Sequence, residues 1–169
     1  MFEDIDAARD MFHRHVPFSD AAFLVLKAHL VVELHLLDFI RTRVSEAVYK
    51  EVEKVREGSF SVRVLLARAL ADRDEIPPQK QNVLWPALQQ LGSLRNLVAH
   101  TLEPNGSSLA DKMSDFIKKV DPDSEFSNAK VGDDELHRTF RDAAFLLTSL
   151  LTIHREPYLL ADELANHDG

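Results

Sequence analysis

The sequence predicts an all-α protein, an up-and-down helical bundle of four to five main helices, and three observations support this prediction. Apolar residues recur at spacings of three and four along most of the chain. The five glycines and seven prolines lie mainly between these periodic segments. Alternation of apolar and polar residues, which is typical of strands, is scarce. Because 169 residues can bury one sizeable core, we expect residues 1–169 to form a single domain.

The first part of the chain predicts two helices that Pro17 separates. Residues 3–15 form a short amphipathic helix. Ser19 or Asp20 then caps a long helix that runs to about Arg43. We expect five residues to make up its inner stripe, namely Leu26, Leu30, Leu37, Ile40 and Val44.

A single acidic residue interrupts this stripe. Glu33 lies four residues after His29, so the two side chains share a helix face and can form an intrahelical hydrogen bond. His29 and Glu33 are therefore candidates for structural support or for positioning a substrate. We predict no metal site here, because no second ligand pair has a convincing spacing and no HExxH motif is present.

Two further helices are predicted in the middle of the chain, after a mostly charged segment from Ser45 to Gly58. The first begins at Ser59 or Ser61 and ends at Leu70. Its buried contacts come from one of two sets, either Phe60, Val64 and Ala67 or Val62, Leu65, Leu66 and Ala69. The second runs from about Pro78 to Leu102, and Pro86 either kinks it or marks its true start.

The last part of the chain predicts two helices with a polar segment between them. Residues 103–108 have the composition of a loop, and a short helix follows from Leu109 to Val120. Residues 121–132 are polar and are expected to be a flexible loop. The final helix begins near Asp133 and ends or bends at Pro157. The expected core faces are Leu109, Met113, Phe116, Ile117 and Val120 in the first helix and Leu136, Phe140, Ala143, Leu147 and Leu150 in the second.

Composition and charge exclude several classes of protein. The chain has no cysteine, which rules out disulfides and thiol nucleophiles and agrees with a reducing cytoplasm. The apolar stretch from Ala21 to Ile40 carries five polar or charged residues, so we expect no membrane-spanning helix. A basic signal-peptide start is absent, and a cytoplasmic location is expected. The net charge of −8 disfavours indiscriminate nucleic-acid binding but allows a local basic groove.

The end of the Pro78–Leu102 helix carries the residues with the clearest chemistry. Arg95 falls on an apolar stripe with Leu84, Leu88, Leu91, Val98 and Leu102, so a guanidinium stands where a leucine is expected. Asn96 and His100 lie four residues apart on another face. An imidazole can move a proton at a ribose hydroxyl, and a guanidinium can neutralise charge on a phosphate. Arg95 and His100 leave the helix about 140° apart, so a shared site requires two copies of the helix across a two-fold axis.

These residues resemble the R-x4-6-H motif of the HEPN superfamily, in the form Arg95-Asn96-Leu97-Val98-Ala99-His100. The resemblance extends to the preceding Leu-Trp-Pro-Ala-Leu-Gln-Gln-Leu run and to an early helix with one internal acid, and it covers residues 20 to 155. It implies an all-α bundle that forms a homodimer and, in many members, a metal-independent endoribonuclease with an RNA substrate and no cofactor. Such members serve as toxins or defence effectors, often restrained by an antitoxin such as a minimal nucleotidyltransferase. By resemblance, Arg95 stabilises the phosphate, His100 is the acid or base, and Asn96 orients one of them or the substrate.

Two alternatives stay open at this stage. Arg95 can pair with Glu33 in the core as a structural ion pair, and His100 can act only as a C-terminal helix cap. The protein would then be a non-catalytic regulator or adaptor, similar to the mannitol-operon repressor branch of the family.

Overall fold

The computed structural model of the protein describes residues 5–16, 20–54, 60–71, 76–100, 106–122 and 134–154. These residues form seven helices and no strand. The helices are α1 (Ile5–His15), α2 (Ala21–Arg41), α3 (Glu46–Lys54), α4 (Phe60–Ala71), α5 (Pro78–His100), α6 (Gly106–Val120) and α7 (Asp134–Ile153). The prediction of an all-α bundle is therefore confirmed.

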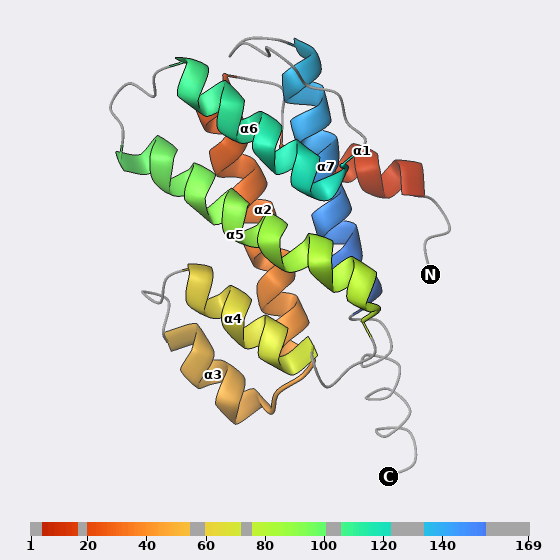
Figure 1. Ribbon diagram of the computed structural model, residues 1–169. Helices are drawn as coiled ribbons and strands as arrows, with labels where there is room; N and C mark the ends of the chain where they lie inside the picture. Colours follow the sequence, from red (N-terminus) through yellow and green to blue (C-terminus); the bar gives the residue numbers. More distant parts are fainter. Residues whose placement is uncertain are drawn as a thin grey trace.

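Helix α2 runs through the middle of the bundle, with α5 and α6 crossing one side and α7 lying along another (Figure 1). α2 packs against α7, α5 and α4, whereas α6 packs against α5 and α7. The core contains large side chains that are fully buried, among them Leu36, Phe39, Leu88, Phe116 and Phe140. Burial of this continuous apolar surface is the main stabilising term of the fold.

Several helix boundaries follow the expected local chemistry. The Asp20 side chain caps α2 by accepting a hydrogen bond of 3.0 Å from the backbone N–H of Phe23. Pro78 is the first residue of α5, a position where the missing backbone N–H has no cost. Pro86 lies inside α5, so it does not mark the start of that helix. The described part of α5 ends at His100, and the predicted extension to Leu102 falls outside the described residues.

The two C-terminal helices have the predicted core faces, but the first of them begins earlier than predicted. α6 begins at Gly106, which places residues 106–108 in a helix instead of the predicted loop. The two predicted core faces are correct, because each of their residues is buried except Val120 and Leu150, which are half-buried. α7 begins at Asp134, close to the predicted Asp133. Most of the loop predicted at 121–132, and Pro157, lie outside the described residues.

The predicted inner stripe of α2 is wrong in its first half. Leu26 and Leu30 are exposed, whereas Leu24, Ala28 and Val32 are buried. The reason is that α2 is apolar on nearly all sides, so helical periodicity alone could not tell which side faces the core. For α4 the structure selects the first of the two alternatives, because Val64 and Ala67 are fully buried and Phe60 is half-buried. Val62 and Leu65 are exposed instead.

Helix α1 is held to α7 by a small ion cluster. Asp142 of α7 accepts a hydrogen bond of 3.3 Å from Nε of Arg9 and lies 3.1 Å from Nε2 of His13. Phe12 packs against Phe145 beside this cluster, with 5.6 Å between the ring centroids. The short first helix is thus held to α7 by one apolar contact and by the two polar contacts of Asp142.

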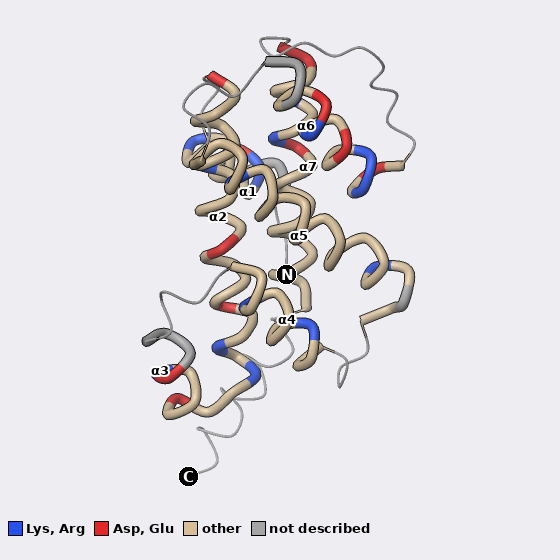
Figure 2. The backbone as a smooth tube through the Cα atoms, turned by 60° about the vertical axis from the view of Figure 1, so that its left-hand side comes forward, with Lys and Arg blue, Asp and Glu red and all other residues tan. Residues whose placement is uncertain are grey.

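Charged residues are unevenly distributed among the helices. In Figure 2 the tube of α5 is almost entirely uncharged, and α6 alternates between acidic and basic residues. Only Lys80 and Arg95 are charged within α5. No helix among the described residues combines the length and apolar composition that crossing a membrane requires.

Candidate functional site

Arg95 does not lie on the buried stripe of α5, which corrects the sequence prediction. The buried series runs through Leu84, Leu88, Leu91 and Leu94, and the side chain of Arg95 is exposed. Each residue turns a helix by about 100°, so a residue directly after a buried leucine points well away from the core. The guanidinium therefore meets solvent and has no need of a buried partner.

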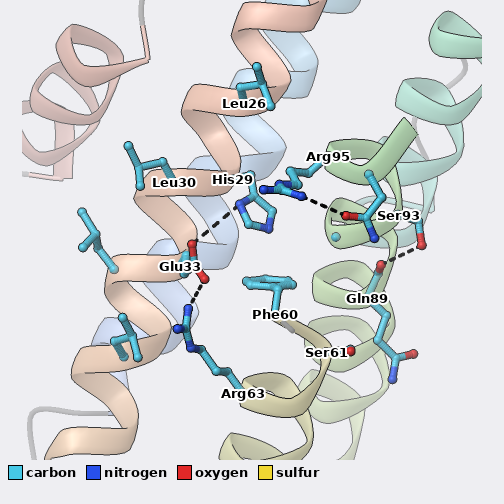
Figure 3. A pocket seen from close by; sticks show the side chains of 14 residues that line it. Leu26, His29, Leu30, Glu33, Phe60, Ser61, Arg63, Gln89, Ser93 and Arg95 are labelled. Carbon is cyan, nitrogen blue, oxygen red and sulfur yellow. Dashed lines mark hydrogen bonds and ion pairs between the residues drawn. The ribbon is translucent and has the colours of Figure 1, made fainter. Parts of the chain in front are cut away.

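Arg95 instead borders an open groove between α2, α4 and α5 (Figure 3). The groove has a volume of about 890 Å³, which is within the usual range for ligand sites. Six of its lining residues carry the chemistry considered below: His29 and Glu33 from α2, Phe60 and Arg63 from α4, and Arg95 and Asn96 from α5. Leucine side chains of α2 form its apolar side.

Arg95 and Asn96 are adjacent at one rim of this groove. Nη1 of Arg95 donates a hydrogen bond of 3.3 Å to the side-chain oxygen of Asn96. Among the residues that the structure describes, no carboxylate pairs with Arg95. Most of its guanidinium donors therefore remain available to an anion.

Glu33 pairs with Arg63 of α4, so the predicted alternative of a pair between Glu33 and Arg95 is wrong. Nη1 of Arg63 donates a hydrogen bond to Oε1 of Glu33. The Arg63 side chain is only 9% exposed, and that of Glu33 is 21% exposed. A guanidinium at this depth needs a carboxylate partner, and Glu33 of α2 supplies it.

His29 lies beside this ion pair on the floor of the groove. Its Nδ1 is 4.0 Å from Oε2 of Glu33, which is too long for the predicted hydrogen bond. Its Nε2 is buried and has no hydrogen-bond partner among the described residues. Burial, followed by the positive charges of Arg95 and Arg63, lowers the pKa of His29 from 6.5 to about 4. The ring is therefore neutral at pH 7.

Phe60 closes the floor of the groove by packing against His29 and α5. The centroids of the two rings are 4.3 Å apart. Phe60 approaches α5 at Gly92, where an added Cβ would lie 2.9 Å from its Cδ1. Only glycine admits this contact, so Gly92 sets the spacing between α4 and α5 at the candidate site.

His100 is separate from this cluster. It is the last residue of α5, its side chain is exposed, and it is not among the residues that line the groove. The structure thus brings together four of the five predicted site residues, Arg95, Asn96, Glu33 and His29. One protomer does not place His100 with them.

Comparison with known protein families, curated proteins and solved structures gives no match for this chain. The site must therefore be judged on its own geometry and charge. Two guanidinium groups and one carboxylate line the groove, and His29 is neutral, so one positive charge remains in a protein of net charge −8. Within the described part of the chain, no group of three or more His, Asp or Glu side chains could hold a metal ion. The arrangement favours an anion.

Sequence reasoning missed Arg63 and Phe60 as site residues. Phe60 is the first residue of the apolar helix α4, and Arg63 lies in its first turn. Neither residue belongs to a motif. One signal was available for Arg63, because a charged residue among Val62, Val64, Leu65 and Leu66 needs a buried partner. The contact of Phe60 with Gly92 has no counterpart in the sequence pattern, since it joins residues 32 positions apart.

Proposed function

We propose that this protein is a homodimeric endoribonuclease of the HEPN type that cleaves RNA without a metal ion. Arg95, Asn96 and His100 are its catalytic residues, and its cellular role is that of a toxin or defence effector restrained by an antitoxin. The observation that carries the proposal is the exposed Arg95 guanidinium, which borders an open groove and has no carboxylate partner among the described residues. A guanidinium in this state is suited to a phosphate.

The proposed reaction is an internal transfer at one phosphodiester. A ribose 2′-hydroxyl gives its proton to an imidazole, and its oxygen attacks the neighbouring phosphorus. The bond from phosphorus to the 5′-oxygen breaks, and that oxygen takes a proton from a second imidazole or from water. The products are a 2′,3′-cyclic phosphate and a free 5′-hydroxyl. Arg95 neutralises the charge that develops on the phosphate oxygens.

The separation of Arg95 and His100 means that the proposed catalytic site requires two copies of the chain. His100 lies at the end of α5, outside the groove that Arg95 borders. In a homodimer, the imidazole of one copy can approach the guanidinium of the other, as the two-fold arrangement of a shared groove requires. Light scattering should then give a molar mass twice that of the 19.2 kDa protomer.

Cleavage of a broad panel of labelled RNAs in the presence of EDTA tests this proposal. We expect cleavage by the wild-type protein to fall by about 10²–10⁴-fold in His100→Ala and by about 10²–10³-fold in Arg95→Ala. Arg68→Ala is the matched control, since Arg68 is an exposed arginine of α4 outside the groove. Unchanged cleavage in His100→Ala, with the fold and the dimer intact, would show that the proposed mechanism is wrong.

A second candidate is a non-catalytic regulator or adaptor, and the position of His100 favours it. A regulator does not need His100 in the groove, and His100 does not line it. The same hypothesis predicts that Arg95 pairs with Glu33 or another buried acid, whereas Glu33 pairs with Arg63 and Arg95 has no carboxylate partner among the described residues. Growth after expression separates the two: an endoribonuclease toxin arrests growth through Arg95, and Arg95→Ala relieves the arrest, whereas a regulator gives the same growth in both cases.

A further inference from the structure

The outer side of α2 carries a row of apolar side chains that the described fold leaves uncovered. Phe23 is 41% exposed, Leu26 39%, Leu30 48% and Leu34 55%, and Leu37 is half-buried. In Figure 3, Leu30 points away from α5. Since α2 is also apolar on its inner side, it is apolar nearly all round, a pattern typical of a helix that is covered on every side.

The spacing of this α2 row is the same when read in either direction. The intervals between successive members are three, four, four and three residues, with Leu30 at the centre. All five members fall within about 40° of the direction of Leu30, because each residue adds about 100°. Reversing the helix therefore places the row on a copy of itself, with Leu26 level with Leu34 and Phe23 level with Leu37.

We propose that a second copy of this chain covers the α2 row, with the two α2 helices antiparallel and crossing at Leu30. A two-fold axis through Leu30 would place every member of this row level with another apolar member of the same row, so the surface is self-complementary, as an isologous interface needs. The three leucines at intervals of four form one ridge, which is the type of ridge that interdigitates in the commonest class of helix packing. The inference rests on the homodimer of the proposed function and identifies its interface.

The area of the α2 row fits the apolar centre of a dimer interface. With roughly 200 Å² for a fully exposed side chain of this size, the four exposed members present roughly 350 Å² per copy. The largest apolar patch on a typical monomer covers about 300–600 Å² and is often functional. Two copies would bury roughly 700 Å² of this row, about half of a standard interface, so the proposed interface must extend to residues beside the row.

This interface also changes the candidate site. Leu26, Leu30 and Leu34 line the same groove as Arg95. The partner's α2 would therefore form a fourth wall of that groove, opposite α5. Each Arg95 would then border a space closed by both copies, which a single protomer leaves open.

Cysteine crosslinking tests the register directly, because the chain has no cysteine of its own. Leu30→Cys should form a disulfide-linked dimer under mild oxidation at least tenfold faster than Leu146→Cys. Leu146 is the matched control, since it lies on α7 and is also 48% exposed. Leu26→Cys alone should not crosslink, since two copies of residue 26 would be separated by about 12 Å along the helices, beyond the reach of a disulfide. A mixture of Leu26→Cys and Leu34→Cys should crosslink between unlike copies.

Three results would overturn the interface. These are equal rates for Leu30→Cys and Leu146→Cys, self-crosslinking of Leu26→Cys, which indicates parallel helices, or a wild-type protein that is monomeric in light scattering. If circular dichroism shows that Leu30→Cys is unfolded, the mixture of Leu26→Cys and Leu34→Cys serves as the test. Crosslinking between the two variants then supports the interface, and its absence refutes it. Crosslinking and RNA cleavage are measured independently. A dimer that crosslinks as expected but cleaves no RNA would support the interface and refute the nuclease. A dimer that cleaves RNA but does not form these crosslinks would support the nuclease and refute the interface.

Discussion

Replacing His29 with glutamine should make the protein less sensitive to acid. In the wild-type protein the pKa of His29 is about 4, against 6.5 for an unperturbed ring. A difference of two to three pKa units corresponds to roughly 3 kcal/mol of folding free energy. The groups that face the ring are Glu33 on its own helix, Arg63 on α4 and Arg95 on α5, and both arginines oppose its protonation.

The sign of the effect follows from the direction of the shift. Because the pKa is lower in the folded state, the unfolded chain takes up the proton first as pH falls. The stabilising contribution of neutral His29 is therefore complete above pH 6.5 and is lost as the pH falls from 6.5 toward 4. A glutamine has no titrating group, so this part of the pH dependence disappears in His29→Gln.

Urea unfolding followed by circular dichroism at pH 7.5 and pH 4.5 measures the effect. We expect the free energy of unfolding of the wild-type protein to fall by roughly 2–3 kcal/mol more than that of His29→Gln over this interval. His15→Gln is the control, because His15 is exposed at the end of α1. Parallel pH profiles for the wild-type protein and His29→Gln would refute the placement of a neutral, buried ring between two arginines. A constant offset between such parallel profiles would report only a packing difference and would leave the refutation in place.

Three further substitutions test contacts elsewhere in the fold. Glu33→Gln should lower the free energy of unfolding, measured in urea, by roughly 3 kcal/mol, because Arg63 would stay buried without its carboxylate partner. The double variant Glu33→Gln/Arg63→Met should recover most of this loss. Gly92→Ala should destabilise the protein by roughly 1–2 kcal/mol because its Cβ overlaps Phe60. In a Phe60→Leu background the same change should become stabilising by roughly 0.5–1 kcal/mol through helix propensity, which thermal unfolding can detect. Asp142→Asn should speed hydrogen exchange in α1 by roughly two- to fivefold while leaving α7 unchanged, since the ion cluster is partly exposed.

The spacing of apolar residues predicted the buried face of a helix correctly only where the opposite face of that helix is polar. In α6, Lys and Asp occupy the outer positions, so Leu109, Met113 and Phe116 could face only inward, and they are buried. In α2 the outer positions are also apolar, and the prediction buried Leu26 and Leu30, which are exposed. The fold class could thus be predicted from the sequence, but the orientation of an all-round apolar helix depends on packing partners that periodicity does not contain.

The candidate site shows the same limit at the level of single residues. The motif Arg95-Asn96 and the neighbouring pair of His29 and Glu33 could be selected from residue types and intervals within one helix. Their meeting in one groove depends on the approach of α2 to α5. Distances between helices are set by contacts such as Gly92 against Phe60, which no intrahelical interval specifies.

Which arginine pairs with Glu33 matters for the proposed function, because the paired arginine is not available to a ligand. Because Arg95 was expected on a buried stripe, the sequence offered Glu33 as its partner, whereas the structure pairs Glu33 with Arg63, which lies on another helix. With Arg95 as the partner, the charge of the motif would be neutralised inside the protein and a phosphate would gain little from it. Because Arg63 takes that role, Glu33 fixes α4 against α2 and Arg95 keeps its donors at the groove. The structural ion pair of Glu33 and Arg63 and the arginine proposed to bind an anion, Arg95, are therefore separate, so either can be substituted without removing the other.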